Sequence, residues 1–137
     1  MILLDTHVWV WWVHGDRRLS ERGLGALDRL ARDTIGISVM SCWEVAMLYQ
    51  RGRLSFSCSL DSWLEQALAY PGVELLGLTR AAAVEACRLP GTFHNDPADR
   101  MFVETAMENG CPLVTDDKRI LEYPHINALL PSALAQE

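Results

Sequence analysis

Four acidic residues stand at places where the ends of parallel strands would bring them together. Asp5 follows the apolar run Met-Ile-Leu-Leu, and Glu44 follows Ile-Ser-Val-Met-Ser-Cys-Trp. Asp99 lies in Asp-Pro-Ala-Asp-Arg, and Asp117 follows Pro-Leu-Val-Thr-Asp. Because the carboxyl ends of parallel strands meet at one edge of a sheet, we expect the four side chains to share one crevice.

Such a cluster of carboxylates implies a bound cation. Two unit charges about 4 Å apart repel by roughly 4 kcal/mol at an effective dielectric of 20, so the cluster needs a cation or must protonate in part. Mg²⁺ and Mn²⁺ prefer carboxylate oxygens as ligands. The pattern therefore predicts a magnesium or manganese centre that assists phosphodiester chemistry, with metal ligands at Asp5, Asp99 and Asp117 and a further catalytic residue at Glu44.

The first two carboxylates also have structural explanations. An ionised Asp5 at the end of a buried strand is costly unless it is paired or binds metal, but the same side chain can cap the helix that follows. Glu44 lies three residues after Ser41, which is the spacing of a capping box. For Glu44, a capping role and a chemical role are equally compatible with the sequence.

The segment Asp-Pro-Ala-Asp-Arg begins a helix. Asp96 fits the N-cap, Pro97 the first helical position, and Asp99 the third, where a carboxylate faces the positive end of the helix dipole. We therefore expect Asp96 to be the cap, with metal binding as its alternative, and Asp99 to be the metal ligand. Arg100 is expected to form an exposed i,i+4 pair with Asp96 or Glu104, or else to hold a phosphate.

Asp116 and Asp117 are neighbours, so both cannot point into the crevice equally well. We assign Asp117 to the site and keep Asp116 as an alternative metal ligand. Hydroxyl groups near the carboxylates are candidates for substrate contacts or supporting roles, although turns and caps explain them equally well; these are Thr6, Ser41 and Thr115.

Strand-like and helix-like segments alternate along the chain. Strands are expected at residues 1–4, 35–39, 73–78, 112–115 and 126–129. Helices are expected directly after Asp5 and at residues 20–32, 41–50, 60–70, 80–89, 97–109 and 118–121. This order predicts an α/β fold with a central, mostly parallel sheet in three α/β/α layers. A single domain would span residues 1–137, with residues 131–137 as a loose tail.

Composition limits the remaining possibilities. A chain of 137 residues, half of them hydrophobic, suits one domain with its own core. The net charge of −6 argues against a globally basic nucleic-acid binder, but residues 1–53 carry seven Arg against six acids, so nucleic-acid contacts are expected in this half. The four cysteines lack paired spacing and no targeting or membrane segment is evident, which favours reduced thiols and a cytoplasmic location.

Taken together, these motifs resemble the PIN-domain family, in particular the VapC-type toxin ribonucleases of type II toxin–antitoxin systems. The motifs are Leu-Leu-Asp-Thr-His, Ile-Ser-Val-Met-Ser-Cys-Trp-Glu, His-Asn-Asp-Pro-Ala-Asp-Arg and Leu-Val-Thr-Asp-Asp. The resemblance extends over nearly the whole chain and maps the family's acidic quartet onto Asp5, Glu44, Asp99 and Asp117. Where the family usually has a non-acidic residue between threonine and aspartate, this chain has Asp116.

The resemblance implies a Mg²⁺ or Mn²⁺ centre, cleavage of single-stranded RNA such as tRNA, rRNA or mRNA, a homodimer and a cognate antitoxin. In that mechanism Glu44 would orient or deprotonate the attacking water. Two alternatives remain. The fragment Asp-Thr-His with Gly15-Asp16 downstream is similar to dinuclear metallophosphatases, and an acidic crevice can also serve a non-catalytic binding module.

Overall fold

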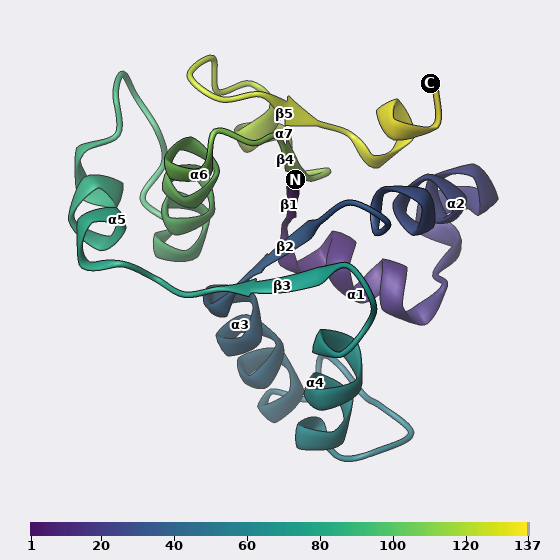
Figure 1. Ribbon diagram of the computed structural model, residues 1–137. Helices are drawn as coiled ribbons and strands as arrows, with labels where there is room; N and C mark the ends of the chain where they lie inside the picture. The colour runs from purple at the N-terminus through teal and green to yellow at the C-terminus, as the bar shows by residue number, and fades with distance from the viewer. Residues whose placement is uncertain (137) are drawn as a thin grey trace.

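A five-stranded, fully parallel sheet forms the centre of the computed structural model, which describes residues 1–136 (Figure 1). Its strands are β1 (Ile2–Leu4), β2 (Ile35–Ser38), β3 (Val73–Leu76), β4 (Leu113–Val114) and β5 (Ala128–Leu129). The spatial order is β3-β2-β1-β4-β5, so the direction of strand addition reverses between β1 and β4. In sheets of this kind the crevice outside the carboxyl ends of the two strands at the reversal is the usual ligand site.

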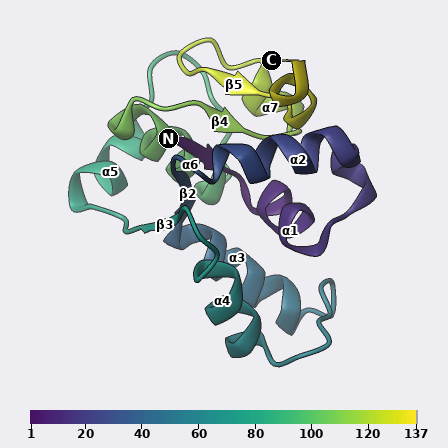
Figure 2. The same ribbon diagram turned by 45° about the vertical axis from the view of Figure 1, so that its right-hand side comes forward.

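Seven α-helices and three 3₁₀ segments surround the sheet. The helices are α1 (Thr6–His14), α2 (Ser20–Leu30), α3 (Val39–Gln50), α4 (Leu60–Leu68), α5 (Arg80–Glu85), α6 (Pro97–Asn109) and α7 (Lys118–Leu121). The 3₁₀ segments are η1 (Arg17–Leu19), η2 (Ala86–Arg88) and η3 (Pro131–Gln136). Figure 2 shows α1 and α2 on one side of the sheet and α5 and α6 on the other. The predicted three-layer α/β/α architecture is confirmed.

The alternation of side chains along β1 divides the core in two. Ile2 and Leu4 pack into one cluster with Trp9 and Leu27 of the first two helices. Leu3 points to the opposite face, where the cluster contains α6 and α7 residues such as Phe102, Val103, Ala106 and Ile120. Both faces of the sheet are therefore covered, which explains why β1 is uninterrupted by polar residues until Asp5.

Strand pairing brings the ends of β1 and β4 into register. Leu4 lies opposite Val114, and the Asp5 amide donates to the Val114 carbonyl at 3.0 Å. The next residues along the two strands, Asp5 and Thr115, consequently stand side by side at the switch point. The parallel arrangement thus places the first and last acidic motifs of the sequence together.

Helix α6 follows the sequence prediction closely. Asp96 is its N-cap and accepts from the Asp99 amide at 3.1 Å, while Pro97 occupies the first helical position. The helix ends at Gly110, whose φ of 58° is in the left-handed region that glycine adopts without strain. The capping residues at its two ends were therefore sufficient to predict the bounds of this helix.

The start of α3 differs from the prediction. The helix begins at Val39 because Ser38 caps it, its side chain accepting from the Met40 amide at 3.1 Å. Ser41 is therefore inside the helix, and the predicted capping box between Ser41 and Glu44 is wrong. Strand β2 correspondingly ends at Ser38, so α3 follows it directly with no residue between them.

The expectation of a loose tail at residues 131–137 is also wrong for its described part. Segment η3 contacts α2, and Leu134 is only 7% exposed. An apolar side chain that finds a partner surface orders the segment despite its short length. Glu137 lies outside the described residues.

Two further properties bear on the sequence predictions. All four cysteines are free thiols, as their spacing indicated. Within residues 1–136, no helix combines the length and apolar character needed to span a bilayer.

Candidate metal centre

A cavity of about 380 Å³ opens at the carboxyl ends of β1 and β4. We call it the acidic cavity, because carboxylates dominate its lining. Its residues come from α1, α3, α6 and the segment that follows β4; they are Asp5, Thr6, His7, Trp11, Glu44, Asp96, Asp99, Phe102, Asp116, Asp117 and Arg119. All four members of the predicted quartet are therefore brought together, along with both alternative ligands.

Asp5 combines the two roles that the sequence suggested. One carboxylate oxygen accepts from the Val8 amide at 3.0 Å and caps α1, while the other accepts a short hydrogen bond from the Thr115 hydroxyl. The side chain is almost fully buried, and this burial raises the pKa of Asp5 to about 6 although both hydrogen bonds oppose the shift. The fold thus holds a carboxyl group whose charge it only partly compensates.

Glu44 is linked to α1 through Thr6. The Thr6 hydroxyl oxygen lies 2.5 Å from Glu44 Oε1 and 3.0 Å from the Ser41 hydroxyl oxygen. Because a carboxylate only accepts, Thr6 donates to Glu44 and accepts from Ser41. Burial raises the pKa of Glu44, the Thr6 hydrogen bond opposes this, and the charge of Asp99 raises it further. Thr6 and Ser41 therefore orient Glu44.

Asp99 lies in the first turn of α6, as predicted, and points into the cavity while Asp96 caps the helix. Its Oδ2 lies 2.7 Å from His94 Nε2. Burial raises the pKa of Asp99, and the charges of Asp96 and Asp117 act in the same direction, whereas the His94 hydrogen bond opposes them. The structure thus gives His94 a direct role in holding Asp99.

Asp117 caps the short helix α7 and accepts from the Arg119 amide at 2.9 Å. Thr115, which donates to Asp5, also accepts from the Asp117 amide at 3.0 Å. Burial works to raise the pKa of Asp117, but the hydrogen bonds and charge of Arg119 outweigh it, so the pKa is lowered. Asp116 lines the same cavity from a more exposed position. One threonine hydroxyl thereby positions two of the predicted ligands.

Arg119 is the residue that sequence reasoning missed. Its Nη2 lies 3.3 Å from Asp117 Oδ2 and 3.6 Å from Asp99 Oδ2, so one guanidinium bridges carboxylates from two elements. The available signal was the Asp-x-Arg spacing, because an N-cap aspartate and an arginine two residues later lie on the same first turn.

Arg100 is not where the sequence placed it. Its guanidinium donates to the carbonyl oxygens of Ala86 at 2.7 Å, Phe93 at 3.0 Å and His94 at 3.1 Å. It does not line the acidic cavity, and the exposed pair with Asp96 or Glu104 is wrong. A guanidinium with five donors can satisfy several loop carbonyls at once, so Arg100 fixes the loop that presents His94.

The donor set suits a hard divalent ion. Carboxylates and hydroxyls supply only oxygen, and the raised pKa values of Asp5, Glu44 and Asp99 indicate that the fold leaves negative charge undercompensated. No three His, Cys, Asp or Glu side chains of residues 1–136 already surround a single ion-sized point.

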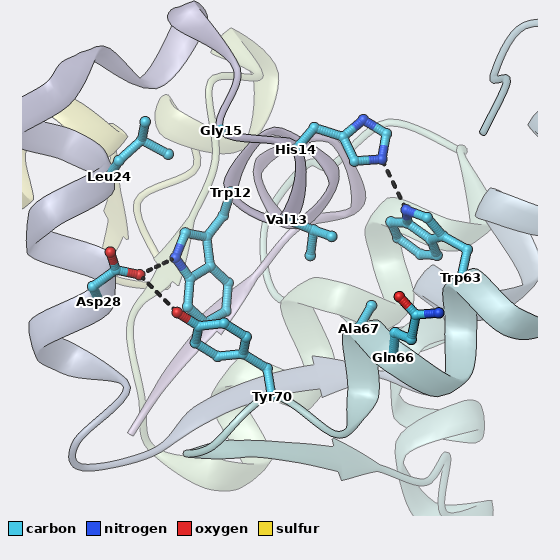
Figure 3. Close-up of a pocket in the computed structure, with 10 residues that line it drawn as sticks. All are labelled: Trp12, Val13, His14, Gly15, Leu24, Asp28, Trp63, Gln66, Ala67 and Tyr70. Carbon is cyan, nitrogen blue, oxygen red and sulfur yellow. Dashed lines mark hydrogen bonds between the residues drawn. The ribbon is translucent and has the colours of Figure 1, made fainter. Parts of the chain in front are cut away.

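A second and larger cavity, of about 580 Å³, lies between α1, α2 and α4 (Figure 3). We call it the aromatic cavity; its main side chains are Trp12, Trp63 and Tyr70. Asp28 accepts from Trp12 Nε1 at 3.0 Å and from the Tyr70 hydroxyl at 3.3 Å, and His14 accepts from Trp63 Nε1 at 2.8 Å. The indole and phenol donors of this cavity are thus paired with Asp28 and His14, while Gln66, which also lines it, donates to Ser62.

The metallophosphatase alternative loses its geometric support. Asp5 and His7 line the acidic cavity, but Asp16 caps η1 and pairs with Arg18 at 3.0 Å. His14, the nearest further histidine in the sequence, is bonded to Trp63 in the aromatic cavity. Among the described residues, the fragment Asp-Thr-His…Gly-Asp therefore does not converge on one site.

A three-layer α/β/α sandwich with carboxylates at the switch point of a parallel sheet defines the class of this protein. The PIN-domain family model matches residues 2–126, and the chain belongs to this family. It is 36% identical to "Ribonuclease VapC22" of Mycobacterium tuberculosis over 124 residues, which are 90% of this chain and 92% of that protein. The family expected from the sequence motifs is confirmed.

Solved structures agree on the fold. A toxin–antitoxin complex from Klebsiella pneumoniae superposes with a TM-score of 0.67 at 16% identity, covering 96% of this chain and 98% of that one. VapBC2 from Rickettsia felis, bound to a DNA fragment from its promoter, gives a TM-score of 0.67 at 20% identity, with coverage of 95% and 97%. FitAcB from Neisseria gonorrhoeae gives 0.66 at 20% identity, with coverage of 96% and 99%.

Proposed function

We propose that this protein is a Mg²⁺- or Mn²⁺-dependent endoribonuclease that cuts single-stranded RNA and acts as the toxin of a toxin–antitoxin module. The observation that carries the proposal is the convergence of Asp5, Glu44, Asp99 and Asp117 on one cavity in a PIN-domain chain. The relative named as a ribonuclease, 36% identical over most of both chains, supports the same activity.

Three carboxylates would hold the ion. Asp5 follows β1, Asp99 lies in the first turn of α6 and Asp117 caps α7, so three separate segments supply these carboxylates to the acidic cavity. A divalent ion supplies Lewis acidity toward water and toward the phosphate oxygens. Thr115 contributes by fixing Asp5 through its hydroxyl hydrogen and Asp117 through its oxygen.

Glu44 would act on the attacking water. Burial raises its pKa, which makes it a stronger base than an exposed glutamate while it remains able to accept a proton. Thr6 donates to Oε1 and so leaves Oε2 to orient the water. In this assignment Glu44 is a catalytic residue and Thr6 and Ser41 are positioning residues.

The same comparisons support an antitoxin as a partner. Structures similar in fold include toxin–antitoxin complexes, and we propose that a separately encoded antitoxin inhibits this protein by closing the acidic cavity. We also propose that the protein is a homodimer. Size-exclusion chromatography with light scattering tests the dimer, and co-expression of the neighbouring reading frame tests the antitoxin.

The activity is tested with the purified protein and a fluorogenic single-stranded RNA in Mn²⁺ and in chelator. Cleavage in Mn²⁺ alone, lost in Asp5→Asn, Asp99→Asn and Asp117→Asn, is the expected result. A matched control is Asp28→Asn, the same chemical change in the aromatic cavity, which should cleave at the wild-type rate.

Equal cleavage by all variants would show that another protein is responsible. Hydrolysis of a chromogenic phosphate monoester without RNA cleavage would favour the metallophosphatase, and RNA binding without cleavage would favour the non-catalytic binding module.

A further inference from the structure

Two sites in the chain share one local motif with different surroundings. At Asp16 and at Asp117, an aspartate caps a short helix and accepts from the amide and the guanidinium of the arginine two residues later. Arg18 reaches its own aspartate at 3.0 Å and lies over the Trp11 ring at 5.5 Å, without contacting a second carboxylate of the described residues. Arg119 reaches Asp117 at 3.3 Å and also extends to Asp99 at 3.6 Å.

The surroundings of Arg119 explain this difference. Six carboxylates line the acidic cavity, and Arg119 is the single Lys or Arg side chain among its lining residues. A guanidinium placed between Asp99 and Asp117 reduces their mutual repulsion in the manner of a cation. Arg119 donates long hydrogen bonds to both oxygens of Asp117, from Nε at 3.4 Å and from Nη2 at 3.3 Å, whereas its contact with Asp99 is an ion pair at 3.6 Å.

A divalent ion would compete directly with this arrangement. Asp99 Oδ2 is engaged by both His94 and Arg119, and Asp117 Oδ2 is engaged by Arg119. An ion that takes these oxygens repels the guanidinium as a like charge. The Arg119 side chain is 60% exposed, so no packing prevents it from leaving.

A neighbouring cavity can receive the Arg119 guanidinium after it leaves the carboxylates. Arg119 also lines a third, shallow cavity of about 270 Å³, whose other lining residues are Thr92, Phe93, His94, Glu122, Tyr123 and Pro124. Arg119 therefore forms the wall between this cavity and the acidic one. A guanidinium there would face solvent beside the metal centre, where it can bind a phosphate through two parallel N–H groups.

We propose that Arg119 is the internal counter-cation of the acidic cavity in the metal-free protein, that it withdraws when a divalent ion binds, and that it then holds a backbone phosphate of single-stranded RNA next to the scissile one. The metal-dependent exchange stands on the geometry alone, whereas the choice of RNA as ligand rests on the proposed function. Arg119 is on this account a substrate-positioning residue that links metal loading to substrate binding.

The first experiment measures Mn²⁺ binding by electron paramagnetic resonance in wild type, Arg119→Gln and the matched control Arg18→Gln. A unit charge about 6 Å from a divalent ion in water corresponds to about a tenfold change in affinity. We expect Arg119→Gln to bind Mn²⁺ about tenfold more tightly and Arg18→Gln to bind as wild type does. Equal affinity in all three proteins would overturn the proposal.

Side-chain NMR separates displacement from a simple loss of charge. The ¹⁵Nε–Hε signal of Arg119, assigned by its absence in Arg119→Gln, should move during titration with Mg²⁺ and saturate with the metal site. The Arg18 signal should stay in place. A stationary Arg119 signal in a protein that binds Mg²⁺ would contradict withdrawal of the side chain.

Fluorescence anisotropy tests the second part of the proposal, that Arg119 binds RNA. The probe is a labelled phosphorothioate RNA, which resists hydrolysis. Wild type and Arg18→Gln should gain RNA affinity when Mg²⁺ is added, and Arg119→Gln should gain about tenfold less. Equal gains in all three proteins would overturn this half. Because no reading depends on turnover, absence of RNA cleavage by wild type would refute the proposed function without deciding the role of Arg119.

Discussion

The two cavities of this protein use polar side chains in opposite ways. In the aromatic cavity the indole and phenol donors meet complementary acceptors, with Asp28 accepting from Trp12 and Tyr70 (Figure 3). In the acidic cavity carboxylates face other carboxylates, and Arg119 is the lone Lys or Arg that lines it. The first arrangement stabilises the fold, whereas the second holds charge that the fold does not neutralise, as expected of a site that binds a cation.

The largest expected difference between the two cavities is the effect of their variants on RNA cleavage. Asp99→Asn removes a charged ligand at the acidic cavity, and the loss of such electrostatic preorganisation typically lowers turnover by about 1,000-fold. Asp28→Asn should leave turnover within about twofold, because the aromatic cavity takes no part in the chemistry. Initial rates on the fluorogenic RNA in Mn²⁺ measure both, and comparable losses in the two variants would remove the distinction.

The pH dependence of stability should identify the acidic cavity in the metal-free protein. The pKa of Asp5 rises from 3.8 to about 6 on folding, so the folded state binds more protons than the unfolded state between these values. Stability contributed by this group is therefore present below about pH 4 and lost as the pH rises toward 6, by on the order of 3 kcal/mol.

Urea denaturation in chelator at a series of pH values measures this slope in wild type and Asp5→Asn. In Asp5→Asn the fall in stability between about pH 4 and 6 should be absent, since an amide does not titrate. A decline of equal size in both proteins would assign it to other groups.

Thr115 tests whether the ligands need positioning. Thr115→Val keeps the shape of the side chain but removes the donor to Asp5 and the acceptor for the Asp117 amide. Loss of such supporting hydrogen bonds typically lowers metal affinity or activity by roughly 10- to 100-fold. Calorimetric titration with Mn²⁺ measures the affinity, and an unchanged value would show that the carboxylates are held by other contacts.

The aromatic cavity should respond in stability rather than activity. Asp28→Ala leaves the partly buried Trp12 Nε1 without its acceptor, which costs about 1–2 kcal/mol in the free energy of unfolding. Urea denaturation measures this cost, with Arg88→Ala as a control for an exposed ion pair. An unaltered midpoint for Asp28→Ala would mean that water replaces the carboxylate without penalty.

The smallest expected effect has the opposite sign. Burial and the neighbouring carboxylates raise the pKa of Asp99, so its ionised form is destabilised in the metal-free fold at neutral pH. Asp99→Asn should therefore raise the melting temperature in chelator, by the equivalent of less than about 1 kcal/mol, because the lost His94 pairing offsets part of the gain. Lower melting in chelator would count against a crowded cluster.

Sequence alone predicted what depends on local signals and strand order. The caps at Asp96 and Gly110, the parallel sheet and the convergence of the four carboxylates all follow from motif positions along the chain. The start of α3 was missed because Ser38 and Ser41 offer equivalent capping groups, and only the length of β2 decides between them. Propensity does not distinguish two serines three residues apart.

The partners of charged side chains were the least predictable feature. Arg100 had an acidic neighbour at helical spacing, yet the carbonyl oxygens of a distant loop bind it. Arg119 and His94 reach Asp99 from outside its helix, across contacts that depend on how α7 and the loop before α6 are placed. Such contacts are set by tertiary structure, so spacing along the chain carries little information about them.

The central claim is that Asp5, Asp99 and Asp117 close around one divalent ion. Anomalous diffraction at the manganese edge from crystals grown with Mn²⁺ tests it directly. The account predicts a peak in the acidic cavity within bonding distance of these three carboxylates, with Arg119 displaced from Asp99. A loaded crystal without a peak there, or with one elsewhere and the carboxylates still held by Thr115, His94 and Arg119, would contradict it.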